Sequence, residues 1–312
     1  MFSPKDIIEA LAANVRKTRS PFGIPKFMVN KWWKKMSLRW EGEYLLFTGL
    51  MYQFMPYIER TTHYLEGFED TKMASLLRFG KYQPRWVSGI GLAMMTPGEG
   101  KKKSDEILQT IAGLLMKSGV DFYYKSKLDE YSGILLYDMG DQENFEKHAR
   151  YVAEKLNRAA VKKIITVDPH TTYALKVLYP KYIGVSFEVK TYFEMLDFRS
   201  GNGGPEQVTL HDPCFYGRYL ELSDVPRKVL RTLGVECVEV RNRGPFTNCC
   251  GGPAESLSPK LSKEVLGRRM EELETTGKPL VAMCPICLGN LRKANPEVQD
   301  LSAVIARHVG QD

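Results

Sequence analysis

The cysteines of this 312-residue chain are confined to its last hundred residues, where five of the six fall into short motifs that also contain glycine or proline. These motifs are His211-Asp212-Pro213-Cys214, Cys249-Cys250-Gly251-Gly252 and Cys284-Pro285-Ile286-Cys287. Iron–sulfur clusters are compact and bind soft thiolates, so the backbone that carries their ligands has to turn tightly. The pattern therefore predicts that five sulfurs converge on one iron–sulfur cluster.

Other uses of clustered cysteines match the chain less well. A disulfide framework suits small secreted proteins, whereas residues 1–10 contain no apolar core behind a basic start of the kind that signal peptides have. Zinc is the stronger alternative, because a C-x-x-C motif supplies two tetrahedral ligands, although zinc normally stops at four. The sixth cysteine, Cys237, lies in the strand-like run 235–240 and is expected to be a small buried hydrophobic residue.

These motifs resemble the cysteine-rich CCG domain of heterodisulfide reductase catalytic subunits and their relatives. The relatives include subunits of sulfite-reducing membrane complexes and of quinone-linked succinate, lactate and glycerol-phosphate dehydrogenases. The resemblance covers residues 206–312 and extends to the segments 211–218 and 224–230. In this family the complete motif holds a noncubane [4Fe-4S] cluster. The resemblance thus implies one such cluster per chain, with the iron ligands Cys214, Cys249, Cys250, Cys284 and Cys287.

The first half of the chain resembles a second CCG domain that has lost its thiols. Its counterparts of the family's cysteines are Leu50, Ser132, Asp168 and Thr171. The two halves also resemble each other, because a strand ending in x-Pro recurs about 116 residues apart, at Asp168-Pro169 and Cys284-Pro285. Such self-similarity indicates internal duplication. Hard oxygen ligands hold iron–sulfur clusters poorly, so no second cluster is expected.

Strand-like and helix-like segments alternate along the chain, which predicts an α/β fold of two Rossmann-like lobes with parallel sheets. Strands are expected within 44–52, 163–167, 207–210 and 279–283, and helices from residue 4 and over 141–156, 224–233 and 258–275. The expected division is a basic, aromatic arm (1–40), a cysteine-free CCG-like domain (41–198) and a cysteine-rich CCG domain (206–312). The cysteines should then lie at the carboxyl ends of parallel strands, where open α/β sheets place their ligands.

Charge is concentrated near the N-terminus. Residues 1–40 hold nine basic and two acidic residues, a net +7 that equals the formal net charge of the whole chain. Trp32 and Trp33 lie among these cations. Three interpretations stay open: a docking segment for an acidic partner subunit, a segment that meets an anionic membrane surface, or a solvated face. Nucleic acid is not an expected partner, because the rest of the chain has no basic excess.

Composition favours a cytoplasmic protein. Hydrophobic residues make up 43% and charged residues 26% of the chain, as in soluble globular proteins. The longest apolar stretch, 44–52, is far shorter than the roughly 18–20 residues of a membrane span. Association with the cytoplasmic face of a membrane would therefore be peripheral and pass through partner subunits.

The chain has neither a complete nucleotide-binding motif nor a ferredoxin cysteine run, so its electrons should come from another subunit. A ferredoxin-like iron–sulfur subunit or a flavin subunit is the expected donor, and a membrane quinone-reactive subunit is a further candidate partner. The leading hypothesis is an oxidoreductase subunit of the heterodisulfide reductase type. It would transfer electrons or reduce a disulfide, thiol or persulfide substrate within a multisubunit complex. The alternative is a non-catalytic relay or assembly subunit of a quinone-linked, membrane-associated respiratory complex.

Three polar residues near the motifs are further candidates. His211 could donate a hydrogen bond or a proton in sulfur chemistry, and is our candidate catalytic residue, or it could fix the loop of Cys214. Arg218 and Arg243 could offset thiolate charge or form ordinary salt bridges.

Overall fold

Two four-stranded sheets organise the computed structural model, which describes residues 4–68, 85–199, 201, 204, 206–256 and 258–309. Every strand pairing in both sheets is parallel. The strands of the first are β1 (Tyr44–Phe47), β2 (Phe122–Tyr123), β3 (Lys163–Thr166) and β4 (Glu188–Thr191). Those of the second are β5 (Glu206–His211), β6 (Val235–Cys237), β7 (Leu280–Ala282) and β8 (Gln299–Asp300). We call these sheets and their surrounding helices the N-terminal and C-terminal lobes. The predicted α/β class with two Rossmann-like lobes is confirmed.

The two lobes have the same topology. The strand orders are β2-β1-β3-β4 and β6-β5-β7-β8, so in each sheet the second strand lies at the edge and the first beside it. Leu50 follows the end of β1 by three residues, as Cys214 follows β5. Asp168 follows β3 by two residues, as Cys284 follows β7. The matching order and spacing are those of an internal duplication.

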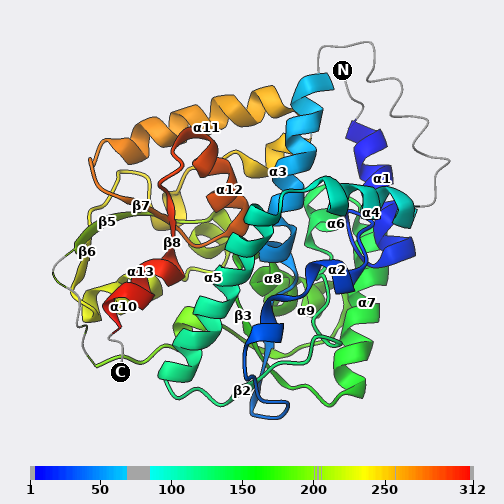
Figure 1. The fold of residues 1–312 in the computed structure, drawn as a ribbon, viewed down its shortest axis with the longest axis horizontal. Coiled ribbons are helices and arrows are strands. Elements are labelled where there is room, and N and C mark those ends of the chain that lie inside the picture. The colour runs from blue at the N-terminus through cyan, green and yellow to red at the C-terminus, as the bar shows by residue number, and fades with distance from the viewer. Residues whose placement is uncertain are drawn as a thin grey trace.

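Helices surround both sheets. Those of the N-terminal lobe are α1 (Pro4–Thr18), α2 (Lys26–Val29), α3 (Met51–Phe68), α4 (Arg85–Met95), α5 (Gly98–Lys117), α6 (Ile134–Asp138), α7 (Gln142–Arg158), α8 (Pro169–Tyr173) and α9 (Tyr179–Ile183). Those of the C-terminal lobe are α10 (Asp224–Thr232), α11 (Pro259–Glu274), α12 (Pro285–Ala294) and α13 (Leu301–His308). Helices α3 and α5 lie along the boundary between the lobes (Figure 1). Among the described helices, none is both long enough and apolar enough to cross a membrane.

Several helices begin at side-chain caps that the sequence contains. Asp141 accepts the amide of Asn144 at 3.2 Å at the start of α7, and Ser258 accepts that of Leu261 at 3.2 Å at the start of α11. Such caps satisfy amides that have no partner within the helix. The expected helices over 141–156, 224–233 and 258–275 are confirmed as α7, α10 and α11.

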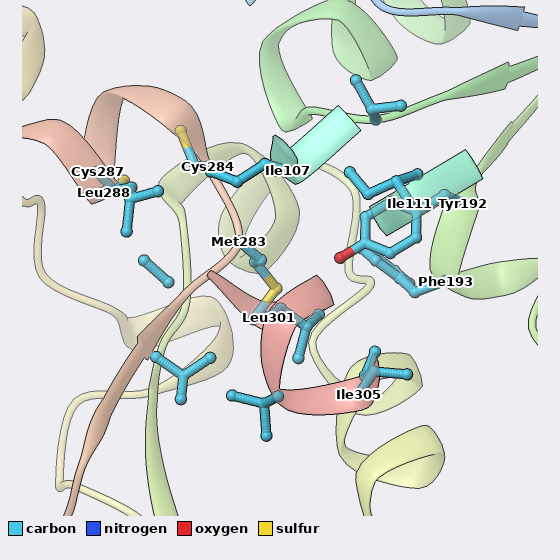
Figure 2. Close-up of a cluster of buried hydrophobic side chains, with 14 of the residues drawn as sticks. Ile107, Ile111, Tyr192, Phe193, Met283, Cys284, Cys287, Leu288, Leu301 and Ile305 are labelled. Carbon is cyan, nitrogen blue, oxygen red and sulfur yellow. The ribbon is translucent and has the colours of Figure 1, made fainter. Parts of the chain in front are cut away.

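One of the apolar core clusters is built from residues of both lobes. Ile107 and Ile111 of α5 face Leu301 and Ile305 of α13, and Met283 lies among them (Figure 2). Burying a side chain of this size stabilises a fold by roughly 1.5–3 kcal/mol. This core therefore fixes the two lobes against each other.

Part of the N-terminal segment is built into the fold. Trp32 is only 1% exposed and its ring packs edge-on against Tyr124 at 4.8 Å, whereas Trp40 is 63% exposed. Lys26 forms an ion pair with Glu130 at 2.6 Å. The aromatic surface available for docking in residues 1–40 is therefore smaller than the composition suggests, and a docking role for the segment stays a prediction.

One buried histidine predicts a pH dependence of stability. His148 in α7 has its Nε2 2.7 Å from the carbonyl oxygen of Tyr131, and burial lowers its pKa to about 4. Below pH 6.5 the unfolded chain therefore binds a proton that the folded chain does not, so this histidine makes the fold less stable as pH falls. A shift of this size is worth roughly 2 kcal/mol between pH 7.5 and pH 5.

We expect the His148→Gln variant to lose this component. Urea unfolding of wild type and variant at pH 7.5 and pH 5 measures it. Other groups titrate equally in both proteins, so the comparison uses the difference between their free energies of unfolding. This difference should change in favour of the variant when the pH falls from 7.5 to 5. A difference that does not change with pH would contradict the prediction.

Candidate metal centre

All five cysteines of the three motifs come together at the carboxyl edge of the C-terminal sheet. Their sulfurs form a continuous series of contacts in the order Cys214, Cys249, Cys250, Cys287 and Cys284. The first two are partly exposed and the other three are buried. The site is therefore closed towards the core and accessible on the side of Cys214 and Cys249.

Cys284 and Cys287 owe their positions to the start of α12. Cys284 is the N-cap residue and Pro285 is the first helical residue, so the sulfur of Cys284 lies near the amide of Cys287, which contributes to lowering the pKa of Cys284. Proline suits this position because its missing N–H would have no partner there. Free amides at a helix N-terminus favour negative charge, so the C-P-x-C sequence places two sulfurs where thiolates are stabilised.

The second motif turns at Gly251, whose φ is +86°. A Cβ at this residue would lie 2.6 Å from the carbonyl oxygen of Ser262, so only glycine fits. The turn aims two amides back at the cysteines: that of Gly251 donates to Cys249 Sγ at 3.3 Å and that of Gly252 to Cys250 Sγ at 3.4 Å. These donors partly offset the charge that the sulfurs carry as ligands.

The acidities of the five thiols differ with their neighbours. Hydrogen bonds from Cys214 and Cys250 hold the pKa of Cys249 far below its usual value. Burial by itself would raise the pKa of Cys284, but hydrogen bonds from Cys287 and His170 lower it well below that value. The pKa values of Cys214, Cys250 and Cys287 are raised, first by the neighbouring sulfur in each case.

Thiolates packed this closely need a cation. The neighbouring sulfurs oppose the ionisation of Cys214, Cys250 and Cys287, because each further negative charge is repelled by those nearby. All five can be thiolates together only around a positively charged centre. The donor set is soft, compact and shielded on one side, and it fits an iron–sulfur cluster.

Asp212 connects the loops that carry the first two motifs. Its carboxylate accepts two hydrogen bonds from Arg227 at 2.8 Å each and one from the amide of Gly244 at 2.7 Å. Its carbonyl oxygen accepts from the hydroxyl of Thr247 at 2.8 Å. Residue 247 immediately precedes Asn248 and the Cys249 turn, so Asp212 sets the distance between the Cys214 loop and that turn.

The two candidate cations have local partners. Arg218 donates through Nε to the carbonyl oxygen of Thr247 at 3.0 Å and so also holds the loop before Cys249. Arg243 is half exposed and pairs with Glu239 at 3.4 Å. Of the two roles considered for it from the sequence, this is the ordinary salt bridge.

His211 lies beside the sulfurs and is almost wholly buried. One of its ring nitrogens is within 4.8 Å of the Sγ atoms of Cys250 and Cys287. Its Nδ1 accepts a hydrogen bond from Arg269 Nε at 3.1 Å, so the ring proton belongs on Nε2. Burial, and then the charge of Arg269, lowers the pKa of His211 to about 3. The ring is thus neutral, an arrangement that favours a role in fixing the loop or donating a hydrogen bond.

Two residues at the centre were not predicted from the sequence. His170, in α8 of the N-terminal lobe, has its Nδ1 3.7 Å from Cys284 Sγ. Burial opposes its charge, but the neighbouring Cys284 and two carboxylates raise the pKa of His170 to about 9. Arg269 in α11 is 1% exposed and bridges His211 and Glu272. The sequence signal that could have identified His170 is its position between Asp168 and Thr171, the counterparts of two family cysteines. Arg269 has no comparable signal in the sequence.

The N-terminal lobe keeps the shape of the site without its sulfur. Asp168 is the N-cap residue of α8 and accepts the amide of Thr171 at 2.9 Å, and Cys284 holds the same N-cap position in α12. Gly133, with φ +91°, turns after Ser132 as Gly251 turns after Cys250. The positions match, but oxygen has replaced sulfur.

Cys237 lies apart from the other thiols. It is half buried in β6, its charged neighbours include Arg227 and Glu239, and burial raises its pKa to about 11. These surroundings are those of a structural cysteine rather than a ligand.

Comparison with known proteins agrees with the motifs. Residues 208–292 match the family model of the cysteine-rich CCG domain. The C-terminal lobe is therefore similar to a CCG domain, and the resemblance of the chain to heterodisulfide reductase-like iron–sulfur proteins is confirmed.

Three relatives illustrate the resemblance. A probable membrane-anchored ferredoxin of Chromohalobacter salexigens is 30% identical over 65% of this chain and 34% of its own length. The EtfAB:quinone oxidoreductase of Syntrophomonas wolfei is 29% identical over 58% of this chain and 28% of its own. A dihydromethanophenazine:CoB–CoM heterodisulfide reductase subunit of Methanosarcina acetivorans is 29% identical over 52% of this chain and 44% of its own. The chain thus spans less than half the length of each of these relatives.

The Gly251 turn predicts a large effect of a small substitution. Gly251→Ala introduces a Cβ 2.6 Å from a backbone oxygen at a positive φ, so we expect the free energy of unfolding to fall by about 1–3 kcal/mol. Urea unfolding of the metal-free protein measures this change.

Gly267→Ala is the matched control. A Cβ at this residue of α11 meets nothing within 4 Å, so alanine should stabilise the helix by roughly 0.5–1 kcal/mol. Equal effects of the two substitutions would mean that the Gly251 turn is not under the constraint described here.

Proposed function

We propose that the protein is an iron–sulfur redox subunit of the heterodisulfide reductase type, with one noncubane [4Fe-4S] cluster per chain held by Cys214, Cys249, Cys250, Cys284 and Cys287. The observation that carries the proposal is the continuous series of contacts that joins these five sulfurs at one site. Zinc would use four and leave a fifth thiol without a role. The matches to a CCG domain, a ferredoxin and a heterodisulfide reductase component support the same conclusion.

The residues around the sulfurs would perform separate tasks. A bound cluster would supply one-electron chemistry and iron atoms with an affinity for sulfur. The amides of Gly251 and Gly252 and the N-terminus of α12 offset thiolate charge. Burial of Cys250, Cys284 and Cys287 excludes water from the inner side, so a reactant or redox partner would approach at Cys214 and Cys249.

Substrate and partners follow from the same resemblance. The chain would receive electrons from a ferredoxin-like iron–sulfur subunit or a flavin subunit, and would reduce a disulfide, thiol or persulfide substrate within a multisubunit complex. Such a complex would place the chain in the cytoplasm or peripherally on the cytoplasmic face of a membrane.

A second function has a specific observation in its favour. One relative is named a quinone oxidoreductase, so a relay or assembly subunit of a quinone-linked membrane complex is the alternative. Turnover of disulfide or thiol substrates by the purified complex distinguishes the two: a relay subunit would pass electrons to a quinone and leave such substrates unchanged.

Chemical analysis tests the cofactor directly. Protein purified without oxygen should contain about four irons and about four acid-labile sulfides per chain and should show one EPR-active centre. Stoichiometric zinc without sulfide would overturn the cluster, and about eight irons would overturn the single site.

Substitution of the ligands tests their identity. Each of Cys249→Ala, Cys250→Ala, Cys284→Ala and Cys287→Ala should lower the iron content or convert the cluster, because each lost thiolate exposes an iron. The fold should persist, since the N-terminal lobe already forms the same topology without thiols. Iron analysis and circular dichroism measure the two effects.

Cys237→Ala is the matched control within the same lobe. It should retain the iron and cost only about 1–2 kcal/mol, as a small truncation in a half-buried strand does. Loss of iron in this variant would show that the ligand set is wrong.

A further inference from the structure

His170 brings the N-terminal lobe into contact with the metal centre. It is the second residue of α8 and is 3% exposed. Its Nδ1 lies 3.7 Å from Cys284 Sγ, across 114 residues of sequence. The distance lies within the range of a hydrogen bond to sulfur, which is longer than one to oxygen because sulfur is the larger atom.

The direction of this hydrogen bond follows from its surroundings. Asp168 Oδ1 also lies near Nδ1, but its distance of 3.8 Å is too long for a hydrogen bond between nitrogen and oxygen. That oxygen already accepts the amide of Thr171 at 2.9 Å. A cysteine that ligates a metal is a thiolate and can only accept, so the proton lies on Nδ1 and points to Cys284.

Contacts from both lobes hold the imidazole in place. The Asp168 cap and Pro169 define the start of α8 and therefore the direction of the next side chain. On the other side, the ring of Phe215 meets the imidazole edge-on at 4.7 Å. Phe215 directly follows Cys214, so the same short loop carries one proposed ligand and positions the partner of another.

Comparison of the two lobes shows that the histidine is a feature of the N-terminal lobe alone at this position. In the sequence match of Asp168-Pro169-His170-Thr171 with Cys284-Pro285-Ile286-Cys287, its counterpart is Ile286. Ile286 is apolar and packs against the hydrophobic cores. A polar donor therefore stands only in the lobe that has lost its thiols, and it reaches a thiol of the other lobe.

We propose that the cysteine-free lobe completes the metal centre through His170, a positioning residue whose Nδ1–H donates to Cys284 and raises the reduction potential of the cluster. A hydrogen bond to a ligand sulfur stabilises the more negative, reduced state. The inference rests on the proposed function, because it requires the cluster. It assigns to the N-terminal lobe a chemical role in addition to its shared core.

Two variants of the full chain test the inference. His170→Leu removes the donor and keeps a buried apolar side chain, whereas His170→Asn puts an amide N–H close to where Nδ1 stood. In a reductive titration followed by EPR and absorbance, His170→Leu should shift the reduction equilibrium about tenfold towards the oxidised state. This is a midpoint about 59 mV lower for one electron. His170→Asn should stay close to wild type.

His148→Asn is the control, because it also replaces a buried histidine of the N-terminal lobe but one that bonds to the carbonyl oxygen of Tyr131. It should leave the midpoint unchanged. An unchanged midpoint in His170→Leu overturns the inference, as does an equal shift in His148→Asn. If His170→Leu loses iron while His170→Asn keeps it, the donor is required at the centre and the inference stands. Loss in both variants overturns it.

These outcomes are separate from failure of the proposed function. A wild-type protein without iron and labile sulfide, or with zinc in their place, refutes the cluster before any variant is made. A wild-type protein with the expected cluster but with identical midpoints in all variants refutes only the role of His170.

Discussion

Thiolates in contact repel one another strongly because they carry charges of the same sign. The C-terminal lobe brings five sulfurs into one series of contacts. Much of the local structure can be understood as compensation for this crowding. The Gly251 turn directs two amides at sulfur, α12 presents its N-terminus to Cys284, and Asp212 ties the two loops together through Gly244 and Thr247. Each of these contacts supplies positive partial charge or fixes a loop. The negative charge of the sulfurs that they do not offset requires a cationic centre.

The features that could be predicted from the sequence are those set by neighbouring residues. The cysteine motifs, the proline after each cap and the alternation of strand and helix are local patterns, and the matching spacing of Asp168 and Cys284 after their strands follows from them. His170 and Arg269 could not be predicted in this way. Their partners lie 114 and 58 residues away, and the contacts depend on how helices pack across and within the lobes. Likewise, composition showed Trp32 among cations but could not show that its ring is buried against Tyr124.

The two lobes separate what the fold requires from what the metal requires. The N-cap position accepts either side chain: Asp168 stands there in α8, where its carboxylate accepts the amide of Thr171, and Cys284 stands there in α12. The glycine turn needs a positive φ, and Gly133 provides it as Gly251 does. Neither requirement involves a soft ligand. The scaffold therefore persists after the thiols are lost, because its stability comes from the apolar core and the caps.

The shared core explains why the cysteine-free lobe remains in place beside the centre. Cys284 and Cys287 belong to the same buried cluster as Ile107 and Ile111 of α5, so the sulfurs lie at the edge of the surface that joins the lobes (Figure 2). The hydroxyl of Tyr52 adds a buried hydrogen bond to Asp300 across this boundary at 2.7 Å. Removing the lobe would expose Cys284 to water on its inner side and raise the local dielectric. The N-terminal lobe thus closes one side of the centre. Because it contacts a ligand sulfur, the side chain that it places at this contact can change the reduction potential of the centre.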